Sequence, residues 1–247
     1  MSDQRLSNPT TNPTTTPTPL DPTVATPAPA LDARTSAAFL SQAFLWMFAG
    51  LIVSAGVSYW VTTSKPLQDF ALDNLFLLFI GQIALVFVIG LGINKISATA
   101  ALGLFFVYAA SLGLTIGLIV YGYEPTSVAG AFLSASAMFG AAAIYGAVTK
   151  RSLAGLGGIL FMGLIGLFAA MIINLFLQSS QVSWIISLVG VVIFTALTAY
   201  DVQRIQNGDL AVWTGSTEKA AVLGALHLYL DFVNLFLFLL RLLGSRN

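Results

Sequence analysis

The sequence contains no cysteine and only one histidine. Without cysteine the chain can form neither disulfides nor thiolate metal sites, and thiol chemistry is excluded. A single histidine excludes a histidine-rich metal centre as well. Charged residues make up only 8% of the 247 residues, and the formal net charge is zero. No basic surface therefore argues for nucleic acid as a partner.

What the sequence has in excess is apolar residues, which make up 57% of the chain and give it a mean hydropathy of +0.88. Such a chain has too little polar surface to cover a water-soluble globule. It also contains repeated apolar runs close to the length that a helix needs to cross a bilayer. We therefore expect an all-α membrane protein that crosses the lipid bilayer several times.

Residues 1–35 differ sharply from the rest, because they hold seven of the nine prolines, many threonines and almost no large apolar side chains. This composition cannot bury enough surface to offset chain entropy, so it predicts a disordered tail. The tail has no hydrophobic core of a signal peptide, so the first membrane helix is expected to direct insertion. The tail is either a docking or modification segment or a solvated extension, and its low complexity favours the second.

Seven apolar runs follow the tail, and each can span the hydrocarbon core with some tilt. Short polar joints, which carry most of the charge outside residues 1–35, separate them. The sequence thus predicts a seven-helix transmembrane domain over residues 36–244, followed by a short end at 245–247. The runs cover residues 39–62, 75–93, 101–121, 128–148, 159–177, 184–200 and 221–243.

Lysine and arginine are distributed unevenly between the two sides of the predicted bundle. Because positively charged loops stay in the cytoplasm, the side with more of them is expected to be cytoplasmic, and it carries the N-terminus. The C-terminus then lies outside if the last run spans, or inside if that run is re-entrant. The richer side has Arg5, Arg34, Lys95, Lys150, Arg151, Arg204 and Lys219, and the other has Lys65, Arg241 and Arg246.

Two acidic residues stand out because they lie in the last two apolar runs. Asp231 lies well inside the final run, where a carboxylate costs at least ~2.5 kcal/mol and normally faces the bundle interior, a partner or water. Asp201 ends the preceding run. Two carboxylates brought together in a dry place share protons. The pair is therefore predicted to sense pH and to act as a gate.

Asp201 has two polar neighbours on its own helix. Thr198 lies one turn before it, and Arg204 lies nearly one turn after it. A simpler interpretation of Asp201 alone is a solvated acid at a helix end, paired with Arg204 and worth a few tenths of a kcal/mol. The presence of Asp231 in the neighbouring run favours the gate.

Asp231 shares one helix face with His227, Asn234, Phe238 and Arg241, because residues three and four apart are neighbours on a helix. His227 is expected to be a packed polar residue that hydrogen-bonds toward the preceding helix, rather than a titrating switch. Asn234 can donate a hydrogen bond near the acid. Arg241 is expected to extend to the membrane interface.

These residues predict a mechanism. A protonated pair of Asp201 and Asp231 can form a hydrogen bond that ties the last helix to the preceding one, whereas a deprotonated pair separates or recruits a cation. A doubly ionised pair suits Ca²⁺, with Asn234 and backbone carbonyls as further oxygen ligands. Such a site is weak, as conduction requires. Protons and transported Ca²⁺ are the expected ligands, and no cofactor is expected.

Two segments resemble the closing signatures of the Bax inhibitor-1 family, also called the transmembrane Bax inhibitor motif family. They are residues 198–205 (Thr-Ala-Tyr-Asp-Val-Gln-Arg-Ile) and 226–244 (Leu-His-Leu-Tyr-Leu-Asp-Phe-Val-Asn-Leu-Phe-Leu-Phe-Leu-Leu-Arg-Leu-Leu-Gly). The likeness covers about residues 36–244. Residues 108–121 and the terminal Arg-Leu-Leu-Gly are similar to bacterial members, so the bacterial inner membrane is the expected location.

The resemblance implies a seven-helix fold in which the last helix is central and the others wrap around it. It also implies a pH-sensitive Ca²⁺ leak controlled by Asp201 and Asp231. His227 stands where the family is expected to have serine or threonine, and the N-terminal tail is an addition to the family pattern. These two departures bear on the pH response. Some bacterial relatives look like modulators of a membrane quality-control protease, which makes such a protease complex an expected partner.

Three functions remain open from the sequence: a cation leak channel, an intramembrane aspartyl protease, and a non-conducting protein that restrains another membrane complex. Tyr200 and Asp201 resemble one motif of the proteases, which use two membrane aspartates as acid and base. Their second motif, Gly-x-Gly-Asp, is absent, because Leu-Tyr-Leu precedes Asp231. No enzymatic activity is therefore expected.

Overall fold

The computed structural model describes residues 33–245, which form nine helices and no strand. The predicted tail lies outside the described residues except for residues 33–35, which belong to the start of the first helix. Residues 246 and 247 also lie outside them.

Seven of the helices in the described part are long and apolar enough to cross a membrane. Each contains one of the predicted apolar runs, apart from a single residue at the end of α3. An all-α membrane bundle is therefore confirmed, and the chain is an integral multi-pass membrane protein. The helices are α1 (Ala33–Thr63), α3 (Leu75–Gly92), α4 (Ala98–Tyr121), α5 (Pro125–Val148), α6 (Leu156–Leu177), α7 (Ser180–Gln206) and α9 (Thr217–Leu243).

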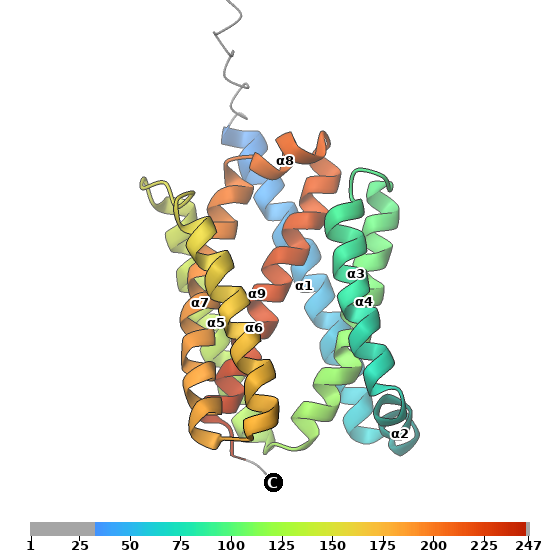
Figure 1. The fold of residues 1–247 in the computed structure, drawn as a ribbon. Helices are drawn as coiled ribbons and strands as arrows, with labels where there is room; N and C mark the ends of the chain where they lie inside the picture. The colour runs from blue at the N-terminus through green and yellow to red at the C-terminus, as the bar shows by residue number, and fades with distance from the viewer. Residues whose placement is uncertain (1–32, 246–247) are drawn as a thin grey trace, which may run out of the picture. The chain divides into compact units, whose positions relative to one another are not determined.

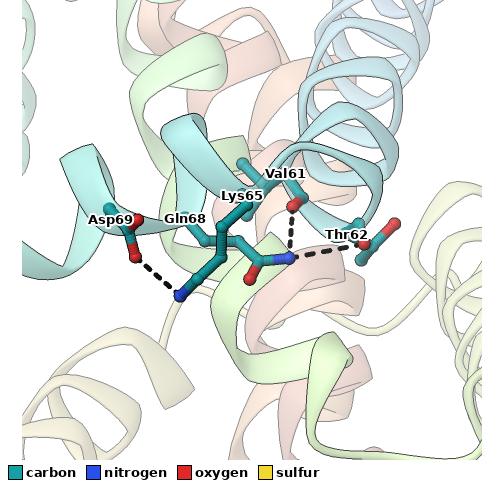
Figure 2. Close-up of polar contacts among 5 residues, drawn as sticks. All are labelled: Val61, Thr62, Lys65, Gln68 and Asp69. Atoms are coloured by element: carbon teal, nitrogen blue, oxygen red, sulfur yellow. Dashed lines mark hydrogen bonds and ion pairs between the residues drawn. The ribbon is translucent and has the colours of Figure 1, made fainter.

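Two short helices, α2 (Lys65–Asp73) and α8 (Asp209–Thr214), occupy joints that the sequence predicted only as polar connections. In α2 the Gln68 side chain turns back to α1, where its Nε2 donates to the carbonyl of Val61 at 2.9 Å, while Lys65 pairs with Asp69 at 2.7 Å (Figure 2). The bond from Gln68 holds α2 against the end of α1. At the opposite end of the bundle, α8 lies between α7 and α9 (Figure 1).

The last helix is the centre of the bundle. In α9, 78% of the most apolar window is buried, against at most 39% in any other candidate span. It packs against α1, α4, α5 and α7, whereas α3 packs on α4 and α6 packs on α7 at the periphery (Figure 1). The central position that the resemblance implied for the last helix is confirmed.

Small residues let the helices approach closely. A methyl group at Gly113 of α4 would lie 2.8 Å from the Ser54 carbonyl oxygen of α1, so only glycine allows this contact. Gly190 of α7 plays the same role toward α9, because a methyl group there would lie 2.6 Å from the ring of Phe238. The second contact joins the two helices that carry Asp201 and Asp231.

The last run extends through the bundle and does not turn back. α9 is continuous over 27 residues, and it ends opposite the end where α1 begins (Figure 1). The start of α1 shares its end of the bundle with α8 and with the turns that follow α3 and α5. Those turns and α8 lie in the joints that carry most of the positive charge. Which end faces the cytoplasm stays a prediction.

Candidate functional site

Asp201 and Asp231 lie on α7 and α9, two helices that pack directly on each other. Only 8% of Asp201 and 4% of Asp231 is exposed. Asp201 is not at a helix end, because α7 continues beyond it to Gln206. The interpretation of Asp201 as a solvated acid paired with Arg204 is therefore wrong. In the described part of the chain, no ion pair joins these two residues.

The two carboxyl groups are close enough to interact electrostatically across the seam between α7 and α9. No lysine or arginine among the described residues forms an ion pair with either of them. The Oδ2 atom of Asp231 is buried and has no hydrogen-bond partner. Because burying a charge without a partner is costly, this oxygen is a natural position for a proton or a cation.

His227 completes a group of three titratable side chains on this seam. Its Nδ1 lies 3.8 Å from Oδ1 of Asp201, which is too long for a hydrogen bond, and this nitrogen has no other hydrogen-bond partner. His227 thus faces α7 as expected, but the expected hydrogen bond is absent. Arg204 acts on both His227 and Asp201 electrostatically without forming an ion pair.

Two predicted supporting residues are engaged with their own helices. The Thr198 hydroxyl donates to the carbonyl of Phe194 at 2.8 Å, and the Asn234 amide donates to the carbonyl of Leu230 at 2.8 Å. Neither forms a hydrogen bond to the acids in the described structure. The Ca²⁺ site predicted at Asp201 and Asp231 accordingly has two carboxylates. Within the described residues, no group of three or more His, Cys, Asp or Glu could hold a metal ion.

On the side toward the end of α9, aromatic packing closes the seam below the acids. Phe238 of α9 lies over Gly190 and against Phe194 of α7, with the two ring centroids 5.8 Å apart. The sequence placed Phe238 on the face of Asp231 but gave it no role. We refer to Phe238, Phe194 and Gly190 as the aromatic seal.

The opposite face of α9 carries a polar contact that the sequence did not reveal. The Tyr229 hydroxyl is hydrogen-bonded to the Ser54 hydroxyl of α1, and Ser54 Oγ lies 2.8 Å from the carbonyl of Ala109 in α4. Tyr229 is fully buried, and its ring packs edge-on against Phe105. α9 is thus fixed to α1 and α4 on one face and presents Asp231 to α7 on the other.

Comparison with known proteins matches the membrane part of the chain. A family model described as "Inhibitor of apoptosis-promoting Bax1" matches residues 36–247. The inner membrane protein YbhL of Escherichia coli (strain K12) is 41% identical over 215 residues, which cover 85% of this chain and 92% of that protein. An uncharacterized protein of Deinococcus radiodurans is 40% identical, covering 85% of this chain and 91% of its own length. The uncharacterized protein YrjE of Lactococcus lactis is also 40% identical, with 84% and 90% covered.

Proposed function

The chain belongs to the Bax inhibitor-1 family, and from this membership we propose that it is a pH-sensitive Ca²⁺ leak channel gated by Asp201 and Asp231. The observation that carries the proposal is the burial of both acids on one seam, with an oxygen of Asp231 that has no hydrogen-bond partner. Because this oxygen lies between α7 and α9, its protonation directly changes how the two helices pack.

The gate has two states. When the pair holds a proton, the repulsion between the two carboxyl groups is relieved and α9 packs against α7, with the aromatic seal in place. When both groups are ionised, their repulsion favours a packing in which the helices separate. pH therefore shifts the populations of a closed and an open arrangement, because the two arrangements differ in their affinity for protons.

Ca²⁺ is the proposed ion because it prefers oxygen ligands and needs no nitrogen or sulfur. In the open state two carboxylates attract the ion into the seam, and two are too few to retain it. Weak binding of this kind allows the ion to leave, as conduction requires. The ion is therefore cargo, and no resident cofactor is part of the proposal.

The role proposed for the acids is transport and not proteolysis. A protease must bring a substrate backbone close to its catalytic aspartates. Here Leu228, Tyr229 and Leu230 precede Asp231, and Tyr229 is fully buried against Phe105 and Ser54. These side chains keep a substrate backbone from approaching Asp231 as closely as glycine residues before the aspartate would allow.

We also propose that the protein resides in a bacterial inner membrane with its N-terminus in the cytoplasm. A relative from Escherichia coli is named an inner membrane protein. The end of the bundle where α1 begins also carries the turns with Lys95, Lys150 and Arg151 (Figure 1). Positively charged turns favour the cytoplasmic side.

The test is Ca²⁺ flux into liposomes loaded with a Ca²⁺-sensitive dye, measured across pH for the wild type and for Asp201→Asn and Asp231→Asn. Both variants are expected to reduce flux and to abolish its pH dependence, because an amide cannot ionise. Asp209→Asn is the matched control, since Asp209 is an exposed acid on α8. Flux that is unchanged in both variants contradicts the proposal. A wild type that does not conduct but co-purifies with a membrane protease, with or without its two aspartates, would instead be a non-conducting modulator.

A further inference from the structure

A hollow of about 680 Å³ lies where α9 ends, between α6, α7 and α9. It is separate from the acid pair, because the aromatic seal lies between them on the same seam. Among the described residues, its wall includes one cation, Arg241, and a set of neutral polar side chains, but no acidic side chain. The polar lining comprises Asn174, Gln178, Ser180 and Ser183.

Arg241 contributes a positive charge to the hollow that no carboxylate in the described part of the chain pairs with. Within the described residues, Arg241 is absent from the ion pairs. Lys65, a cation at the same end of the bundle, is paired with Asp69 at 2.7 Å (Figures 1 and 2). That hydrogen bond raises the pKa of Lys65 and gives its charge a partner outside the hollow. The two cations therefore differ in their capacity to attract an anion.

The position of Arg241 is fixed by the end of its helix. The Gly244 backbone, one turn further on, lies so close to the ring of Tyr123 that a methyl group there would come within 2.6 Å of it. The amide of Glu124 donates to the carbonyl of Ser245 at 3.1 Å, and the amide of Ser245 donates to Ser127 Oγ at 3.0 Å. The last turn of α9 is thus held against the turn between α4 and α5.

The opposite wall is also held in place. The amide of Asn174 donates to Ser183 Oγ at 2.7 Å, and its Oδ1 accepts from the backbone amide of Ser179 at 3.2 Å. This pair of bonds links the end of α6 to the start of α7. The polar walls on both sides of the hollow are therefore set before any ligand arrives.

The surroundings of the hollow are those of a membrane interface. Three membrane-spanning helices begin or end there, so it lies at the depth of lipid headgroups. Leu175 and Trp184 line it and remain 72% and 55% exposed. A tryptophan at this depth is typical of the interface, and the exposed leucine offers a contact for acyl chains.

We propose that this hollow binds the headgroup of an anionic glycerophospholipid from the surrounding bilayer, with its phosphate on Arg241 and its acyl chains over Leu175 and Trp184. Arginine binds phosphate oxygens with two parallel N–H donors. The hydroxyl and amide groups of the wall suit a headgroup with hydroxyls. Since no carboxylate of the described residues lines the hollow, it offers no ion pair to the ammonium of a zwitterionic headgroup. This inference does not depend on ion conduction.

The test is native mass spectrometry of the full chain, purified in detergent and titrated with phosphatidylglycerol or with phosphatidylcholine. The wild type is expected to retain phosphatidylglycerol preferentially, and Arg241→Gln is expected to weaken that retention by about tenfold, as for one charged hydrogen-bond donor. Arg241→Lys should restore part of it, because the charge returns without the paired donors. Lys65→Gln is the matched control and should leave retention unchanged.

Three results would overturn the inference. The first is equal retention by the wild type and Arg241→Gln, and the second is an equal loss in Lys65→Gln, which would indicate general surface charge. The third is full displacement of the lipid by soluble glycerol phosphate, which would assign the hollow to a free phosphate ester. A thermal unfolding midpoint for each variant separates loss of the site from loss of the fold.

Discussion

The Nδ1 atom of His227 lies 3.8 Å from Oδ1 of Asp201, on the neighbouring helix, and forms no hydrogen bond. The same histidine lies one turn before Asp231 on α9. Its ring therefore stands beside the acid pair and faces α7. An imidazolium at this distance would stabilise an ionised Asp201, whereas a neutral imidazole would not. The charge of the histidine therefore decides whether it takes part in the gate or, as the sequence suggested, only packs beside it.

His227→Asn is expected to move the pH at which flux is half-maximal upward, by up to about one pH unit. The reason is that asparagine cannot carry the positive charge with which a protonated His227 favours ionisation of Asp201. The amplitude of the flux should be retained, because both acids remain. The measurement is the liposome flux assay across pH. A variant with the wild-type profile would show that His227 carries no charge where the gate operates.

Asp231→Asn is expected to change how stability depends on pH. At high pH, once both acids are ionised, the wild-type seam holds two carboxylates that repel each other, while the variant holds one, so the variant should unfold at a higher temperature than the wild type. At low pH protonation removes the repulsion, and the difference should shrink. Stability that rests on the protonated pair is present at low pH and is lost as pH rises. Thermal unfolding in detergent at both pH values measures this, and parallel curves would contradict a shared proton.

The sequence could predict the seven spans because each is a long apolar run, and it could predict the acid pair because carboxylates inside such runs are rare and need a partner. It did not predict the roles of Thr198 and Asn234. Short polar side chains in a helix can bond the carbonyl of the preceding turn, and both residues do so. Residue spacing does not show whether such a side chain bonds the nearby acid or the carbonyl of the preceding turn, because both lie three or four residues away on the helix.

Contacts between helices were also beyond the sequence. Ser54 and Tyr229 are 175 positions apart, and no local pattern indicates that they meet. The contact between Phe238 and Gly190 also depends on how the helices pack, because the ring fits only where the facing helix has no side chain. The sequence therefore located the chemistry of the site, whereas the packing determined what surrounds it.

Phe238→Ala is expected to raise Ca²⁺ flux at pH values where the wild type is closed, because it removes the ring that covers the seam. It should also destabilise the protein by about 3 kcal/mol, the cost of deleting a packed aromatic ring. Gly190→Ala should raise flux by displacing the same ring, since its added methyl group would lie 2.6 Å from it. Phe168→Ala is the control, because Phe168 is half-exposed on the peripheral helix α6. If Phe238→Ala and Gly190→Ala both show wild-type flux, the conducting path is closed at another position.

Tyr229→Phe removes only the hydroxyl that bonds Ser54, and it leaves the ring against Phe105. Hydrogen bonds between membrane helices contribute about 0.6 kcal/mol on average, so a small loss of thermal stability is expected. The pH profile of flux should be unchanged, because Tyr229 and Asp231 lie on opposite faces of α9.

A double-mutant cycle with Ser54→Ala separates this bond from other effects of the two substitutions. If the bond joins α9 to α1, the double variant should be no less stable than the weaker single variant. Strictly additive losses would show that each hydroxyl acts through another partner. A shifted flux profile in Tyr229→Phe would mean that the fixed face of α9 also moves when the gate opens. In that case the acids would displace the whole helix against α1 and α4, and not only the seam with α7.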